Sequence, residues 1–121
     1  MSITTAYISH GGGPLPLLER VTDEDGKGGA NHKEMIEVLK TLSRDMRRPD
    51  VIVVVSAHWE ENNTQVTASN HPSLIYDYYG FPERAYTLQY PALGISDLSA
   101  SIVAGLQAQG IDATANPNRG F

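Results

Sequence analysis

Two histidines carry the strongest chemical signal in this sequence. His10 lies in the segment Ile-Ser-His-Gly-Gly-Gly-Pro, and His58 lies in the segment Val-Val-Val-Ser-Ala-His-Trp. Each imidazole stands where an apolar, β-branched run gives way to small residues, a pattern typical of the end of a buried strand. Ligands of open α/β sheets bind beyond the carboxyl ends of the strands, where two imidazoles can hold one metal ion. We therefore predict that His10 and His58 are metal ligands.

A structural role is the alternative for each histidine. His10 could be a turn residue bonded to the backbone, but the three glycines that follow it allow close approach of backbone to a metal or substrate. His58 could be a buried, satisfied histidine, but a polar group at the end of a valine-rich strand is costly unless something binds it. Four other residues are weaker candidates, because a solvated side chain explains each of them: His32, His71, Glu60 and Glu61.

The His-Gly-Gly-Gly segment allows a second interpretation. In lipases and esterases such a loop forms the oxyanion hole, in which backbone N–H groups stabilise a tetrahedral intermediate. That chemistry needs a Gly-x-Ser-x-Gly nucleophile elbow, and the sequence contains none. An esterase-type hydrolase is therefore the less favoured function, since His58 would also have no role in it.

Composition narrows the class of protein further. The 121 residues are 40% hydrophobic and carry a net charge of −5, which is typical of a globular protein without a nucleic-acid-binding surface. Because there is no cysteine, any metal must be held by His, Asp or Glu. No apolar stretch has membrane-spanning length and no export signal begins the chain, so we expect no membrane association and a cytoplasmic location.

Four segments are predicted to form strands. Residues 3–9 are short and rich in Ile, Thr and Tyr, and glycines end them sharply. Residues 51–55 are apolar without alternation, as in a central parallel strand covered on both faces. Residues 64–69 and 111–115 complete the set.

Two helices are predicted between these strands. The first begins near Asn31, which forms a capping box with Glu34, and its apolar face repeats at helical spacing. Ser96 or Asp97 caps the second helix, and Gly110 ends it. The apolar faces consist of Met35, Leu39, Leu42 and Met46 in the first helix and Leu98, Ile102 and Leu106 in the second.

The connecting segments differ in character. Residues 22–29 are acidic and glycine-rich, and we interpret them as a solvated loop or lid because their oxygen spacing does not match an EF-hand. Residues 70–91 are dense in Tyr, Pro and Gly and predict a long aromatic loop. The order of elements predicts a three-layer α/β/α fold with a central, mostly parallel or mixed sheet.

Five segments together resemble the class III extradiol ring-cleaving dioxygenases, in the branch of the LigB-type and DOPA 4,5-dioxygenase-like proteins. They occur in family order along the chain. The segments are residues 9–14 (Ser-His-Gly-Gly-Gly-Pro), 54–59 (Val-Val-Ser-Ala-His-Trp), 75–82 (Ile-Tyr-Asp-Tyr-Tyr-Gly-Phe-Pro), 90–94 (Tyr-Pro-Ala-Leu-Gly) and 119–121 (Arg-Gly-Phe).

The resemblance implies that His10 and His58 are two ligands of a non-haem Fe(II), with zinc in some relatives, and that a later His or Glu completes the site. It implies ring opening of a catechol by O2, with protons managed by a histidine outside the metal shell. The aromatic loop could line the substrate pocket, for which we name Gly12, Tyr76, Tyr79 and Phe81.

The sequence departs from the family pattern at its end, because relatives continue after Arg-Gly-Phe with Asp-His-Gly. Residues 1–121 are therefore predicted to be the N-terminal part of one catalytic domain, without a catalytic acid–base residue of its own and with little or no activity alone. Uncovered sheet edges predict pairing with another copy or with the missing C-terminal half. A non-catalytic relative that binds a metal or a partner is the rival interpretation.

Overall fold

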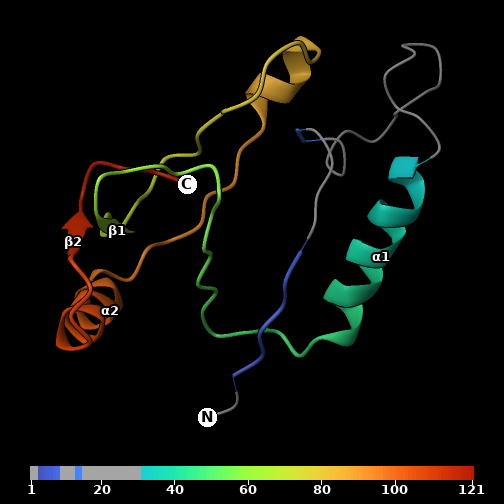
Figure 1. Ribbon diagram of the computed structural model, residues 1–121. Coiled ribbons are helices and arrows are strands. Elements are labelled where there is room, and N and C mark those ends of the chain that lie inside the picture. The colour runs from blue at the N-terminus through green and yellow to red at the C-terminus, as the bar shows by residue number, and fades with distance from the viewer. Residues whose placement is uncertain (1–2, 9–12, 15–30) are drawn as a thin grey trace. The chain divides into compact units, whose positions relative to one another are not determined.

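The computed structural model describes residues 3–8, 13–14 and 31–121 (Figure 1). The chain divides into two compact units, one made of Met1–Val53 and Tyr78–Ala85 and the other of Val54–Asp77 and Tyr86–Phe121. The expectation of a single domain over residues 1–121 stays a prediction.

The second unit contains a parallel sheet. Within the described residues this sheet has two strands, β1 (Thr64–Thr67) and β2 (Ala113–Asn116). Thr64 pairs with Ala113 and Thr67 with Asn116, and backbone hydrogen bonds extend the pairing at both ends. The strands predicted at 64–69 and 111–115 are thus confirmed in slightly shorter or shifted form, and the fold is α/β.

Helix α2 (Ser96–Ala108) packs against both strands (Figure 1). Ala113 in β2 is fully buried, and Ser99 in α2 is buried as well. The Ser99 hydroxyl donates a 2.7 Å hydrogen bond to the carbonyl of Thr67, while Gln107 Nε2 donates to the carbonyl of Ala113 at 2.8 Å. These bonds satisfy polar groups where helix and sheet meet, so they help to fix the position of α2 on the strands.

The ends of α2 confirm one predicted cap and correct the other. The N-cap is Ile95, whose carbonyl accepts the first helical bond from Ser99, and no side chain caps the helix. Ser96 and Asp97 therefore belong to the first turn of the helix. There the negative charge of the Asp97 carboxylate interacts favourably with the positive end of the helix dipole. At the other end Gly110 has a φ of +78° and closes a Schellman motif, as predicted.

Helix α1 (Asn31–Asp45) belongs to the first unit and confirms the predicted helix. Its predicted apolar residues Met35, Leu39 and Leu42 are half-buried. Arg44 stands in the last turn, where a cation is favoured by the helix dipole.

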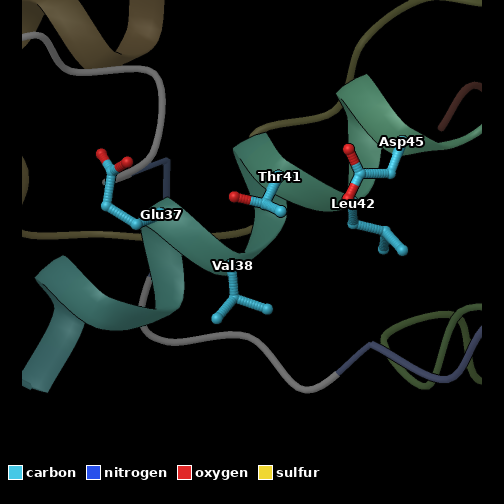
Figure 2. A pocket seen from close by; sticks show the side chains of 5 residues that line it. All are labelled: Glu37, Val38, Thr41, Leu42 and Asp45. Carbon is cyan, nitrogen blue, oxygen red and sulfur yellow. The ribbon is translucent and has the colours of Figure 1, made fainter.

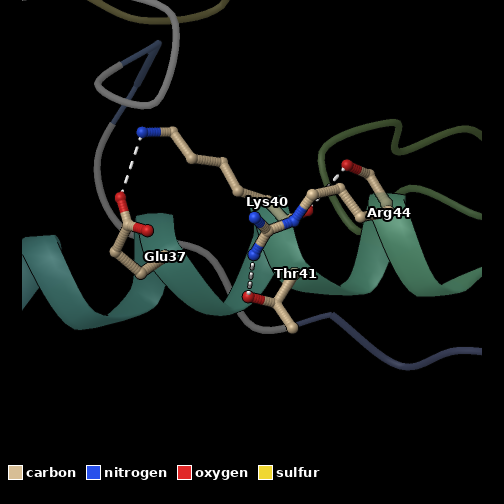
Figure 3. Close-up of polar contacts among 5 residues, drawn as sticks. Glu37, Lys40, Thr41 and Arg44 are labelled. Atoms are coloured by element: carbon tan, nitrogen blue, oxygen red, sulfur yellow. Dashed lines mark hydrogen bonds and ion pairs between the residues drawn. The ribbon is translucent and has the colours of Figure 1, made fainter.

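Helix α1 carries a hollow and a set of local polar contacts. The hollow is lined by Glu37, Val38, Thr41, Leu42 and Asp45, all from this one helix (Figure 2). Lys40 pairs with Glu37 at 3.1 Å, and Arg44 donates to the hydroxyl of Thr41 at 3.0 Å (Figure 3). Contacts between residues three apart support the helix. Among the described residues, the hollow is lined by this helix alone, and we place no candidate site there.

Two of the predicted strands are wrong. Residues 3–8 and 51–55 are irregular and exposed, with Tyr7 97% and Val55 96% accessible. A strand exists only through hydrogen bonds to a neighbour, and within the described residues neither segment has a strand beside it. The apolar run 51–55 is therefore not the buried central strand that its composition indicates. The predicted arrangement of helices on both faces of a sheet stays a prediction.

The aromatic loop is confirmed as irregular. From residue 70 to residue 91 it contains one short 3₁₀ helix, η3 (Glu83–Thr87), and neither strand nor α-helix. Across the described part of the chain, no helix combines the length and apolar character needed to cross a membrane.

Candidate functional site

His58 lies in an exposed turn directly after the apolar run 51–55. Its backbone N–H donates to the hydroxyl of Ser56 at 3.1 Å. Its ring atom Nδ1 lies 2.8 Å from Oδ2 of Asp77, and both side chains are about half exposed. The histidine that the sequence singled out is thus paired with a carboxylate 19 residues further along the chain.

The segment that carries Asp77 is held by the C-terminal residues. Phe121 donates its backbone N–H to Ser73 at 2.9 Å and accepts from Ile75 at 2.7 Å, the pattern of a parallel bridge. Gly120 lies so close to Ser73 that a Cβ there would collide with the Ser73 carbonyl. A glycine is therefore needed for this close approach.

A second contact joins the C-terminal residues to the His58 segment. The guanidinium of Arg119 lies over the ring of Trp59, 5.2 Å from its centroid, and Trp59 Nε1 donates to Glu61 at 3.0 Å. The backbone N–H of Arg119 donates to Asn116 at the end of β2. Arg119 Nε is buried and has no hydrogen-bond partner among the described residues. The ring beside His58 is thus tied to the end of the sheet by a cation–π contact.

Tyrosines complete the packing around this segment in the second unit. The Tyr76 hydroxyl donates to the carbonyl of Leu88, and the Tyr76 and Tyr86 rings meet edge to face at 6.1 Å. Tyr90 meets Phe121 in the same way at 5.7 Å. Tyr76 is therefore anchored at both its ring and its hydroxyl, directly next to Asp77.

In the first unit, the aromatic loop contacts Gly13, the last residue of the glycine run 11–13. Gly13 has a φ of +58°, and a Cβ there would collide with the ring of Phe81. Phe81 also packs edge to face on Tyr78 at 5.3 Å, and the Tyr78 hydroxyl donates to Ala85. Tyr79, by contrast, is 92% exposed.

The predicted site residues are distributed as follows. His10 and Gly12 lie outside the described residues, so the convergence of His10 with His58 stays a prediction. Tyr76 lies beside the His58–Asp77 pair, whereas Tyr79 and Phe81 belong to the other unit. In the described part of the chain, no group of three or more His, Asp or Glu side chains is placed to hold a metal ion.

Among the weaker candidates, Glu61 accepts from Trp59, and the backbone of His71 donates to Ser69. Two residues that contact the His58 segment were not among the predicted site residues, namely Asp77 and Arg119. Both lie in segments that carry the family resemblance, and their position in those segments was the one available signal. Neither residue has a local pattern that reveals its partner.

Comparison with known proteins identifies the class. The family described as the catalytic LigB subunit of aromatic ring-opening dioxygenase matches residues 4–121. The α/β fold accords with this match, which spans nearly the whole chain. The chain belongs to the LigB family.

Individual relatives agree with this assignment. Dioxygenase tasH of Hapsidospora irregularis is 38% identical over 94% of this chain and 35% of its own length. A 4,5-DOPA dioxygenase extradiol-like protein of Schizosaccharomyces pombe is 32% identical over 98% of this chain and 42% of its own. The 4,5-DOPA dioxygenase extradiol of Escherichia coli is 45% identical over 51% of this chain and 23% of its own length. The chain thus spans well under half the length of these relatives, and no solved structure matches it.

Proposed function

We propose that this chain supplies part of the metal centre of an extradiol ring-opening dioxygenase that acts on a catechol with O2. His10 and His58 are two ligands of a non-haem Fe(II) in this proposal, and zinc suits the same imidazole donors. The observation that carries it is the His58–Asp77 hydrogen bond in a chain of the LigB family.

The residues present fit such a metal. A ligating histidine usually donates its second ring N–H to a carboxylate or carbonyl, which fixes the ring and raises its basicity. His58 has this arrangement through Nδ1, so Nε2 is the nitrogen that would face the ion. Two histidines and one further ligand would leave an iron ion open positions for substrate and oxygen.

Each proposed site residue has a separate role. His10 and His58 hold the ion, which when bound supplies the redox chemistry that O2 needs to react with an aromatic ring. Gly12, with its small size, allows the substrate to approach the backbone. The aromatic side chains that we propose to contact the flat catechol ring are Tyr76, Tyr79 and Phe81.

The names of the relatives support the substrate class. Relatives from bacteria, fission yeast and plants are named 4,5-DOPA dioxygenase extradiol or extradiol-like, and DOPA is a catechol. We therefore propose a catechol substrate. We expect the 121-residue chain alone to turn over little, because the chain covers less than half the length of the relatives it matches and the proposal places only two ligands, His10 and His58, in it.

The proposal is tested by metal content and ring opening in the wild-type chain, His10→Ala and His58→Ala. After anaerobic loading with Fe(II) and desalting, we expect less bound iron in each variant than in the wild type. The yellow absorbance of a ring-opened semialdehyde, with DOPA as the catechol, should be weak for the 121-residue chain. Ordinary enzymatic turnover by this chain would contradict the expected low activity. Unchanged iron in both variants would refute the site and favour a non-catalytic relative.

A further inference from the structure

We infer that Asp77 is a positioning residue that sets the tautomer and the direction of the His58 ring. This inference rests on the proposed function, since it concerns the nitrogen with which His58 would hold the metal. The two side chains meet at 2.8 Å through His58 Nδ1 and Asp77 Oδ2. An ionised carboxylate can only accept, so Nδ1 carries the proton. In a neutral ring Nε2 then has the lone pair that a metal requires.

The His58 side of the pair is held by contacts that do not involve Asp77. Ser56 accepts from the backbone N–H of His58 and shapes the turn. The next residue, Trp59, is fixed by the guanidinium of Arg119 over its ring and by its bond to Glu61. The backbone position of His58 is therefore set independently, and the ring torsions are what the Asp77 bond restrains.

The Asp77 side is held separately. Two residues before it, Ile75 donates to the backbone of Phe121 at 2.7 Å, and the adjacent Tyr76 is anchored to Leu88. An ion pair between two mobile surface side chains contributes little, because its formation must order both. Here both backbones are already ordered by other contacts, so the hydrogen bond at 2.8 Å acts on ring orientation.

The first experiment measures the tautomer without any metal. In the ¹⁵N-labelled chain at about pH 8, where an unperturbed imidazole is neutral, long-range ¹H–¹⁵N spectra distinguish protonated from unprotonated ring nitrogens. Comparison with His58→Ala assigns the His58 signals. We expect a protonated Nδ1 in the wild type, a mixture of tautomers in Asp77→Ala, and return of the wild-type pattern in Asp77→Glu. The matched control is Asp112→Ala, because Asp112 is an exposed carboxylate in the same unit.

The second experiment is a Zn²⁺ titration of the same chains against a chromophoric chelator. Loss of a carboxylate behind a ligating histidine typically weakens metal binding by about 10–100-fold, and we expect this for Asp77→Ala with partial recovery in Asp77→Glu. Asp112→Ala should bind as the wild type does.

The outcomes separate the inference from the proposed function. A wild-type tautomer in Asp77→Ala overturns the inference, even if Zn²⁺ binding falls, because Asp77 would then act on the metal directly. Wild-type Zn²⁺ affinity in Asp77→Ala, together with weaker binding in His58→Ala, also overturns the inference but leaves the proposed function intact. Equal affinity in the wild type and His58→Ala refutes the proposed function, whatever the tautomer of His58.

Discussion

Replacing Gly120 with alanine should loosen the contact between the C-terminal residues and the segment that carries Asp77. A Cβ at Gly120 would collide with the carbonyl of Ser73 and lie 2.7 Å from its hydroxyl oxygen. Because the main obstacle is backbone, the two segments must move apart. That movement breaks the hydrogen bonds of Phe121 with Ser73 and Ile75.

The magnitude follows from these two bonds. Each contributes a net free energy of about 0.5–1.5 kcal/mol, so Gly120→Ala should lower the free energy of unfolding by about 1–3 kcal/mol. With a urea dependence of about 1–3 kcal/mol per molar, the unfolding midpoint should fall by roughly 1 M. The effect should extend to function, since displacement of this segment also moves Asp77 away from His58.

Gly105→Ala is the matched control. Gly105 lies inside α2, and a Cβ there would meet nothing within 4 Å. Alanine in a helix interior is favoured over glycine by roughly 0.5–1 kcal/mol, so this variant should be more stable than the wild type.

Urea unfolding followed by the fluorescence of the single tryptophan, Trp59, measures both variants, because Trp59 lies in the second unit. Wild-type stability of Gly120→Ala would contradict this prediction, because it would mean that the close approach to Ser73 contributes nothing to the fold. Destabilisation by Gly105→Ala would contradict the control and the placement of Gly105 in α2.

Two further predictions concern the sheet and the apolar run. Ser99→Ala should lower the free energy of unfolding by about 1–2 kcal/mol, because the carbonyl of Thr67 loses the hydrogen bond from the Ser99 hydroxyl. A urea midpoint equal to that of the wild type would count against this prediction. The exposed apolar residues 51–55 should make the chain self-associate, and sedimentation that shows one monomeric species at all concentrations would argue against it.

The elements predicted correctly from the sequence are those whose signal is local. Apolar spacing at 3.6 residues identified α1 and α2, and Gly110 marked an end of α2 because only glycine adopts its left-handed backbone easily. The run 51–55 failed because apolar composition indicates a tendency to be buried, whereas a strand also requires a hydrogen-bonded neighbour.

In the candidate site, too, the residue with a local sequence signal was predicted and its distant partners were not. His58 could be identified from its place after an apolar run, but its partner Asp77 stands 19 residues away on an irregular loop. The contact of Arg119 with Trp59 joins two segments that are far apart in the sequence, because Trp59 precedes β1 and Arg119 follows β2. Such pairs depend on which loops lie next to one another in the folded chain. Neither the periodicity of apolar residues nor the position of turn residues predicts that arrangement.

In the proposed site His10 and His58 together hold one metal ion. X-ray absorption of the Zn²⁺-loaded chain tests this arrangement, because the scattering of imidazole rings reveals how many histidines bind the metal. We predict two histidine nitrogens at about 2.0–2.1 Å in the wild type, and one in either His10→Ala or His58→Ala. A shell of oxygen ligands alone, or the same number of histidines in the wild type and both variants, would exclude a metal site shared by His10 and His58.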